Sequence, residues 1–281
     1  MKGLQQQVLQ SAIAEMIDAK IEVIIHQAIG STNDWSLQQC RNGRTLPFAC
    51  FAENQTSGRG RRGKQWLMSA GANIAMSITW PFNLSAHGLN NLPISIALAV
   101  VKTLEAINLA HVQIKWPNDI YVQGKKIAGI LIETQPLKGS LSAGEDAEVR
   151  HSADNLVAVV IGIGLNYDMS LFDPASLNDD CRLLPDLTDI SSEISGQGVA
   201  LEASREYVAA MLLREVINTC RDFQRNSERN LEVFRERYDY CKDKTVIVVL
   251  DEQQACTGVA QGVNGNAELV VKVDGTDRVF N

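Results

Sequence analysis

Four basic side chains lie within one short, glycine-rich loop. The run GRGRRGK at 58–64 contains Arg59, Arg61, Arg62 and Lys64. Guanidinium groups present fork-shaped donors that match phosphate and carboxylate oxygens, and glycines let a backbone approach a ligand closely. Because the whole chain has a net charge of −7, this local positive charge is not part of a general basic surface. The loop therefore predicts a site for an anion, and a solvated basic loop without a ligand stays the alternative.

The letters of 58–63 also satisfy G-x-G-x-x-G, the fingerprint of dinucleotide-binding folds. That motif directly follows an apolar strand, opens a helix, and has an acidic residue ~20 positions further on. Here the polar segment ENQTS precedes the loop, a stretch with one further glycine, Gly71, follows it, and the next acidic residue is Glu105. The sequence also lacks G-x-x-x-x-G-K-[ST]. Both patterns of nucleotide binding are therefore disfavoured.

Four other polar segments adjoin apolar ones. They are STN at 31–33, KWPND at 115–119, KKIAGILIE at 125–133 and GIGLN at 162–166. Each has an ordinary structural interpretation, because serine and threonine cap helices and a lysine in a strand usually faces solvent. Alone, none of these segments predicts a function.

Together with GRGRRG, and in this order, these segments resemble the bacterial biotin–protein ligases. The matching pieces span residues 31–166, and the similarity weakens toward residue 281. The resemblance implies that biotin and ATP form biotinyl-5′-AMP, with release of pyrophosphate. Biotin then passes to a specific lysine of the biotin carboxyl carrier protein of acetyl-CoA carboxylase. Mg²⁺ is implied as well, because the triphosphate of ATP needs charge neutralisation.

The resemblance assigns two overlapping sets of ligand residues. The biotin set is Ser31, Thr32, Asn33, Gln55, Arg59, Gly60, Arg61, Lys126 and Gly129. The nucleotide set is Arg59, Arg61, Trp66, Asn118, Lys126 and Asn166. Small hydroxyl and amide groups suit the ureido ring of biotin, whose carbonyl and N–H groups would be costly to bury unpaired. No metal ligand is assigned within the protein itself.

Three of these positions are implied to be catalytic. Lys126 would bridge the biotin carboxylate and the α-phosphate, and Arg61 would retain the adenylate, since fixed cations offset the repulsion between two anions. Asp119 would orient the acceptor lysine or accept its proton. The glycines of the loop favour ordering over the ligand, which would exclude water from the reactive anhydride.

Some assignments keep two interpretations. Trp66 would lie against the adenine or belong to the core, and Asn118 would contact the nucleotide or the metal. Gly129 would line the biotin pocket or serve only strand packing. Lys125 is expected to be the solvated neighbour of Lys126, because adjacent strand residues face opposite sides.

The periodicity predicts elements that would position these residues. Helices are expected at 4–18, 31–42, 92–107, 200–227 and 229–240, with the helix at 92–107 well buried. Strands are expected at 21–25, 47–53, 73–80, 112–116 and 155–167, and a hairpin at 119–134. The segment 135–154 is predicted to be a polar surface excursion, and 168–198 is predicted to be rich in loops.

The resemblance implies an α+β fold with a mixed β-sheet flanked by helices, similar to class II aminoacyl-tRNA synthetases. A small C-terminal β-barrel of the Src-homology-3 type would follow, in line with the short strand patterns from residue 242 onward. The predicted domains are a catalytic domain at 1–240 and a small all-β domain at 241–281. The chain stops at DRVFN, short of a terminal segment that relatives carry, so the barrel is expected to be incomplete. The loop that orders around the adenylate in relatives is expected at 176–192.

Composition and length restrict the remaining function classes. The six cysteines show no C-x-x-C or zinc-type spacing, and no apolar run reaches the ~20 residues of a membrane helix, so a cytoplasmic protein is predicted. Only 20 residues precede the first predicted strand, too few for a winged helix-turn-helix, so DNA binding is not expected. A lipoate–protein ligase, a non-catalytic biotin sensor and a nucleic-acid-binding protein remain the alternative functions. A homodimer through an exposed sheet edge stays open.

Overall fold

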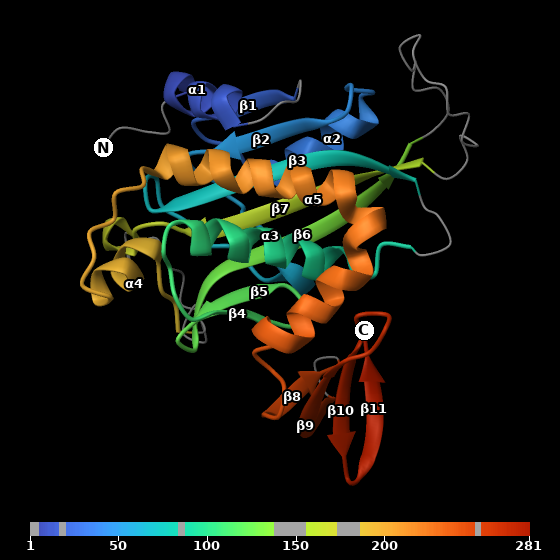
Figure 1. The fold of residues 1–281 in the computed structure, drawn as a ribbon. Coiled ribbons are helices and arrows are strands. Elements are labelled where there is room, and N and C mark those ends of the chain that lie inside the picture. The colour runs from blue at the N-terminus through green and yellow to red at the C-terminus, as the bar shows by residue number, and fades with distance from the viewer. Residues whose placement is uncertain (1–5, 17–20, 84–87, 138–155, 173–185, 251–253) are drawn as a thin grey trace.

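Seven strands form one mixed sheet in this protein, seen here in a computed structural model (Figure 1). The structure describes residues 6–16, 21–83, 88–137, 156–172, 186–250 and 254–281. The strand order is β1-β2-β3-β7-β6-β5-β4. The strands are β1 (Glu22–His26), β2 (Phe48–Ala52), β3 (Asn73–Asn83), β4 (Val112–Lys115), β5 (Asp119–Val122), β6 (Lys125–Pro136) and β7 (Leu156–Asn166). Only β1 and β2 run parallel to each other; the other pairs are antiparallel.

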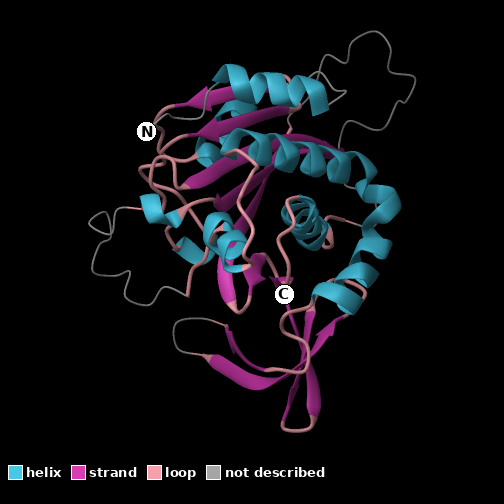
Figure 2. Ribbon diagram, turned by 60° about the vertical axis from the view of Figure 1, so that its left-hand side comes forward, coloured by secondary structure: helices cyan, strands magenta, loops and turns pink. Residues whose placement is uncertain are grey.

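Helices cover both faces of this sheet (Figures 1 and 2). Helices α3 (Leu92–Ala106) and α5 (Arg205–Val233) pack together on one face, and α1 (Gln6–Met16) packs beside α5. Helix α2 (Thr32–Arg41) packs on the other face, against β3 and β7. Helix α4 (Ile190–Gly196) is short. The predicted mixed sheet flanked by helices is therefore confirmed.

The sequence explains why α3 is central to the core. Apolar residues surround most of this helix, from Leu92 to Leu104, and nearly all of them are buried. Strand β7 is likewise buried along almost its whole length, as expected for a strand in the middle of a sheet covered on both faces.

One prediction about the helices is wrong. The two helices expected at 200–227 and 229–240 are a single helix, α5, which ends in a π-helical turn at Phe234–Tyr238. The polar run around Asn226 and Ser227 suggested a break, but it contains no glycine or proline to interrupt the backbone hydrogen bonds. Leu231 and Phe234 are buried and hold the last turns against the core.

A second sheet follows α5. Its four antiparallel strands are β8 (Thr245–Val249), β9 (Ala255–Val263), β10 (Leu269–Val273) and β11 (Thr276–Phe280), in the order β11-β10-β9-β8. We call it the C-terminal sheet. It has its own small core, built around Val271 and Ala260. The predicted all-β tail is confirmed, whereas the domain boundary at 240/241 stays a prediction.

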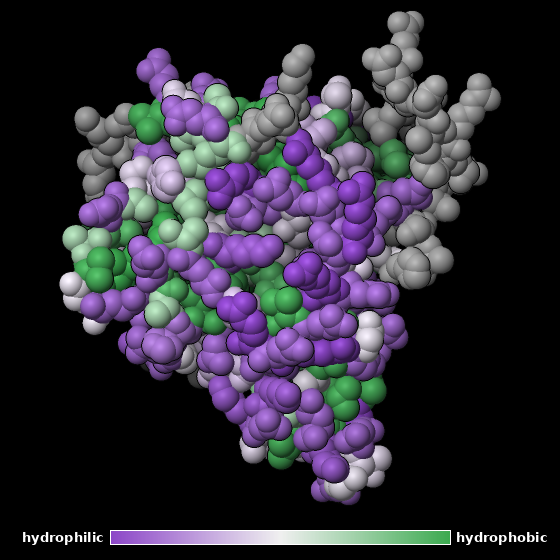
Figure 3. Space-filling view, viewed as in Figure 1, coloured by the Kyte–Doolittle hydropathy of each residue, from purple (hydrophilic) through white to green (hydrophobic). Residues whose placement is uncertain are grey.

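The C-terminal sheet lies below the mixed sheet in Figure 1 and is tied to it by side chains. The Trp116 indole donates to the carbonyl of Ala267 at 2.8 Å, and Arg235 Nε donates to the carbonyl of Val263 at 3.0 Å. Trp116 also packs against the cores of both sheets. Hydrophobic side chains reach the surface in this part of the molecule, among hydrophilic ones (Figure 3); they include Ile247, Val249, Val259 and Val279.

Two predicted segments lie mostly outside the described residues. The polar excursion expected at 135–154 is described only as far as residue 137, with β6 running to Pro136. The loop expected at 176–192 is described from residue 186, where it leads into α4. Within the described part of the chain, no helix is long and apolar enough to cross a membrane.

Candidate active site

The middle of the mixed sheet is lined with small residues on the face that α2 covers. Ser77 of β3 pairs with Gly162 of β7, and Gly164 of β7 pairs with Gly129 of β6. A Cβ atom on Gly162 would lie 2.2 Å from Asn33 Oδ1, and one on Gly164 would lie 2.2 Å from a ring carbon of Trp66. The glycines therefore form a hollow in which Asn33 and Trp66 lie directly on the sheet.

Asn33 belongs to a hydrogen-bond network at the start of α2. Ser31 caps the helix, because its hydroxyl accepts from the Asp34 amide at 3.4 Å. Thr32 donates to Gln55 Oε1 from its amide at 2.8 Å and from its hydroxyl at 3.1 Å. The helix start is thus fixed against the segment that follows β2.

The same network continues through the sheet. Ser77 Oγ lies 2.7 Å from Thr32 Oγ1 and donates to Asn33 Oδ1 at 2.6 Å. The Asn33 amide donates to Glu133 Oε2 at 2.9 Å. Thr32, Asn33 and Ser77 are all buried, so each polar atom needs a partner and the network has a defined geometry. It offers hydroxyl and amide groups side by side in one place.

The basic loop is a hairpin rather than an open coil. The Trp66 amide donates to the Gly58 carbonyl at 2.9 Å, and the Gly60 amide donates to the Lys64 carbonyl at 2.7 Å. The Arg59 guanidinium reaches back to α2 and β6, where it pairs with Asp34 at 2.6 Å and Glu133 at 2.7 Å. One arginine of the loop is therefore neutralised within the protein.

The KWPND turn between β4 and β5 receives a second arginine. Arg61 donates to Asn118 Oδ1 at 3.4 Å, and the Asn118 amide group donates to the Ile130 carbonyl at 2.7 Å. The next residue, Asp119, pairs with Lys126 at 2.7 Å. Two cations from separate segments thus meet two consecutive residues of one turn.

The surroundings stabilise the charged form of Arg59 but not that of Arg61. Partial burial opposes the charge of Arg59, but Glu133 and Asp34 offset this and raise its pKa. Desolvation and the neighbouring Arg62 lower the pKa of Arg61, against a smaller favourable effect of Asp119. Arg61 is therefore the arginine whose charge the protein compensates less, and an anionic ligand would stabilise it.

A cavity of about 450 Å³ adjoins these residues. It lies between the hairpin, the KWPND turn, the start of α3 and the C-terminal sheet. Its lining includes Arg59, Arg61 and Asn118, together with Asn266 and Ala267. Lys126, Gly129 and Trp66 do not line it, but Lys126 Nζ lies 5.9 Å from the centre of the Trp66 ring, and both contact the position of Gly129.

Asn166 is placed differently from the other predicted ligand residues. It is buried, accepts from the Asn73 amide group at 2.9 Å, and donates to the Thr188 carbonyl at 2.9 Å. The backbone of the same segment pairs with Lys126, whose amide donates to the Asp186 carbonyl at 2.8 Å. Asn166 therefore connects β3 and the segment at 186–189, next to the lysine.

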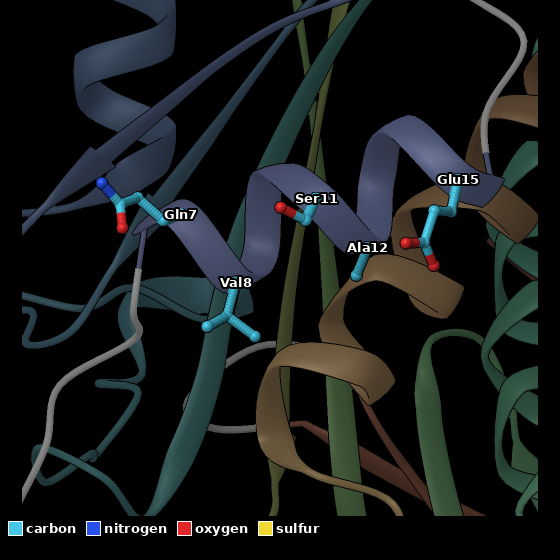
Figure 4. Close-up of a pocket in the computed structure, with 5 residues that line it drawn as sticks. All are labelled: Gln7, Val8, Ser11, Ala12 and Glu15. Carbon is cyan, nitrogen blue, oxygen red and sulfur yellow. The ribbon is translucent and has the colours of Figure 1, made fainter.

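Another depression of the surface has no such chemistry. It lies along α1, and the described residues that line it are Gln7, Val8, Ser11, Ala12 and Glu15 (Figure 4). These side chains come from one helix and include a single carboxylate. We therefore take the hairpin, the KWPND turn and the glycine hollow as the candidate active site.

Comparison with known proteins identifies the family of the chain. The Biotin/lipoate A/B protein ligase family matches residues 27–145, which include the hairpin and the KWPND turn. The biotin–[acetyl-CoA-carboxylase] ligase of Mycobacterium tuberculosis is 30% identical over 253 residues, covering 88% of this chain and 81% of that protein.

The chain belongs to the biotin/lipoate A/B protein ligase family. Another relative, the bifunctional ligase/repressor BirA of Escherichia coli, is 27% identical over 253 residues, covering 90% of this chain and 70% of BirA. The biotin protein ligase of Aquifex aeolicus, solved in complex with biotin and ATP, superimposes with a TM-score of 0.66 at 20% identity. It covers 92% of this chain and 95% of its own. At that identity, the likeness supports the ligase fold.

In this ligase fold, most of the sequence-predicted residues converge. Thr32, Asn33 and Gln55 share one network, Ser31 caps the helix beside it, and Arg59 joins the network through Glu133. Arg61, Asn118, Asp119 and Lys126 meet at the KWPND turn. Gly60 lies in the hairpin, and Gly129 and Trp66 lie at the glycine hollow. Lys125 is exposed, as predicted.

Two residues of the candidate site were given no role from the sequence. Ser77 lies in the middle of an apolar strand, and Glu133 follows the KKIAGILI run. A single serine in an apolar strand is common, so nothing in the sequence around Ser77 marks it as a site residue. Its partner across the sheet, Gly162, was the available sign, because a glycine in a buried strand marks a close approach.

Replacing Gly162 by alanine is expected to weaken biotin binding by about tenfold, because the new methyl group would displace Asn33 from Ser77 and Glu133. Isothermal titration with biotin measures this. Gly196→Ala is the matched control, since a Cβ there meets nothing within 4 Å. Unchanged biotin affinity in folded Gly162→Ala would show that Asn33 does not contribute to binding.

Proposed function

We propose that this family member is an ATP-dependent biotin–protein ligase. It activates biotin as biotinyl-5′-AMP and transfers biotin to a lysine of a biotin carboxyl carrier protein. The observation that carries the proposal is the meeting of Arg61 and Lys126 at the consecutive residues Asn118 and Asp119. Two fixed cations beside a cavity suit a reaction between two anions.

The first step joins the biotin carboxylate to the α-phosphate of ATP. The carboxylate oxygen attacks phosphorus, the bond from the α-phosphorus to the bridging oxygen breaks, and pyrophosphate leaves with the electron pair. Lys126 would hold the two anions together, and Arg61 would stabilise the charge that gathers on the phosphoryl oxygens. Because these cations are already fixed by Asp119 and Asn118, little reorganisation is needed as charge develops.

The second step transfers the acyl group. A neutral amine of the acceptor lysine attacks the carbonyl carbon of biotinyl-5′-AMP, the mixed anhydride breaks, and AMP leaves. Asp119 is the carboxylate nearest to these cations, so it would orient the ammonium group or accept its proton. Its present partner, Lys126, holds this carboxylate at the turn through an ion pair of 2.7 Å.

Biotin is favoured over lipoate by the network at the start of α2. Thr32, Asn33 and Ser77 offer hydroxyl and amide groups that suit a ureido ring. A dithiolane ring has no N–H or carbonyl group to exchange hydrogen bonds with this network, so lipoate would gain none of the polar contacts that a ureido ring makes. Lipoate in place of biotin is therefore expected to support little pyrophosphate release.

Mg²⁺ would enter with ATP. Among the described residues, no group of three or more His, Cys, Asp or Glu side chains could hold a metal ion. The proposed cation would be held mainly by phosphate oxygens and water, as Mg²⁺ usually is in nucleotide sites. Asn118, at the edge of the cavity, could add one carbonyl ligand. The cation would supply charge neutralisation on the triphosphate.

The carrier partner, a cytoplasmic location and a homodimer through a sheet edge stay predictions. The direct test incubates the protein with biotin, ATP, Mg²⁺ and a biotin carboxyl carrier domain. We expect biotin-dependent release of pyrophosphate and a gain in carrier mass equal to one biotinyl group. Folded protein that binds biotin but releases no pyrophosphate would instead support a non-catalytic biotin sensor.

Replacing Arg61 by glycine is expected to let the adenylate escape. The substitution removes the cation at Asn118 while the hairpin keeps its Arg59 contacts, so retention should fall while the fold persists. Biotinylation of lysines in a bystander protein should rise about tenfold, as expected from the loss of one charged contact. Mass spectrometry of added serum albumin measures it. Bystander labelling equal to that of the unmodified protein would assign retention to another residue.

A further inference from the structure

The tip of the basic hairpin has an unusual residue for its backbone conformation. Arg62 has φ 54° and ψ 39°, and Gly63 follows with φ 72°. The Lys64 amide donates to the Arg61 carbonyl at 3.2 Å and closes the turn. Two successive residues with positive φ form the tight hairpin turn that favours Asn-Gly or Gly-Gly. An arginine at the first of these positions is disfavoured by about 1 kcal/mol or more.

The length and charge of Arg62 explain what this side chain adds. Its Nη1 atom donates to the carbonyl of Val249, the last residue of β8. Strand β8 is the outer strand of the C-terminal sheet, where backbone groups lack a neighbouring strand on one side. Asparagine would suit the turn better, but its side chain is too short to span this distance.

We propose that Arg62 is a positioning residue that fastens the tip of the hairpin to the C-terminal sheet and so retains the acyl-adenylate. The inference rests on the proposed function for the identity of the retained ligand. Arg59 and Arg61 flank the tip and contact β6 and the KWPND turn, whereas Arg62, which also lines the cavity, donates to the C-terminal sheet. Each of the three arginines of this loop therefore contacts a different part of the protein.

The remaining contacts of the C-terminal sheet make this role specific. Trp116 and Arg235 bind the carbonyls of Ala267 and Val263, and they do not involve the hairpin. Loss of the Arg62 contact would free the hairpin tip while the sheet stays docked. Ala267 also lines the cavity beside Arg61. The C-terminal sheet therefore contacts both the KWPND turn, through Trp116, and the hairpin, through Arg62.

Three variants of the full chain test the proposal. Arg62→Asn removes the contact but favours the turn, and Arg62→Lys keeps a long cation. Lys64→Asn is the matched control, since it removes a charge from the same loop at a position with no side-chain contact to the C-terminal sheet among the described residues. The rate at which biotinyl-5′-AMP dissociates is measured by rapid gel filtration after the adenylate has formed.

We expect Arg62→Asn to speed dissociation by about tenfold, the effect of losing one charge-assisted hydrogen bond. Arg62→Lys should stay within about threefold of the unmodified protein, and Lys64→Asn should match it. A role confined to the fold of the loop predicts the opposite order, because Asn fits the turn best. Unchanged retention in Arg62→Asn, or equal losses in Arg62→Asn and Lys64→Asn, would overturn the proposal.

Hydrogen exchange of the ligand-free chain gives an independent measurement. The amides of Gly60 and Trp66, which close the hairpin, should exchange faster in Arg62→Asn than in the unmodified protein. Equal or slower exchange would overturn the fastening role. If the unmodified protein forms no adenylate, the proposed function fails, and this exchange comparison still decides whether Arg62 holds the hairpin.

Discussion

Replacing Lys126 by glutamine is expected to lower the rate of pyrophosphate release by about 10²–10³-fold, the usual cost of removing one fixed electrostatic contact from a transition state. Lys126 pairs with Asp119 of the KWPND turn and also contacts the position of Gly129 in the glycine hollow. Glutamine keeps a donor for Asp119, so the loss would report the missing charge rather than an unpaired carboxylate. Single-turnover formation of biotinyl-5′-AMP measures the effect on the first step alone.

Lys125→Gln is the matched control for this experiment. It removes the same charge one position earlier in β6, but its side chain is exposed while that of Lys126 is largely buried. We expect this variant to stay within about twofold of the unmodified protein, as surface substitutions usually do. If both variants lose the same activity, the effect is one of general charge, and Lys126 has no direct contact with the reacting groups.

The sequence predicted the elements well where one physical signal dominated. The apolar run of α3 and the continuous apolar strand β7 were both found, because burial on all sides leaves an unambiguous pattern. The end of α5 was missed, because polar residues near Ser227 suggested a break that only glycine or proline would impose. Tertiary packing of Phe234 decided the outcome.

In the candidate site, too, some features could be predicted from the sequence and others could not. Motif residues such as Lys126 and Asp119 were found, and the structure adds that they are partners. The pairing of Arg59 with Asp34 and Glu133 could not be predicted, because it joins positions 25 and 74 residues away along the chain. Such partners depend on strand register and on where α2 lies, and no local pattern in the sequence records either.

These contacts also give the loop a consistent interpretation. Arg59 fastens its base to α2 and β6, Arg62 fastens its tip to the C-terminal sheet, and Arg61 between them faces the KWPND turn. Two outer anchors would hold the central cation over the cavity. A loop that was only flexible and basic would attract anions, but it would not place one charge at a defined position.

A buried ion pair supports this site from behind, and breaking it is expected to have the largest effect on stability. Arg205, at the start of α5, binds Glu53 through two hydrogen bonds of 3.0 and 2.8 Å, and both side chains are only 7% exposed. Replacing Arg205 by methionine should lower the free energy of unfolding by about 3–5 kcal/mol, because Glu53 would keep a buried charge without this partner. Urea denaturation followed by circular dichroism measures it.

Two further variants separate the ion pair from simple loss of packing. Arg214→Met breaks a pair with Glu215 on the same helix, where the arginine is 35% exposed, so it should cost about 1 kcal/mol or less. The double variant Arg205→Met, Glu53→Leu removes both charges and should recover most of the lost stability. If the double variant is as unstable as Arg205→Met, the cost lies in packing or in the lost bond to the Asn73 carbonyl. Biotin affinity is measured on the same variants. If the double variant regains stability but binds biotin more weakly than the unmodified protein, the pair also positions Gln55, two residues beyond Glu53, for its contacts with Thr32.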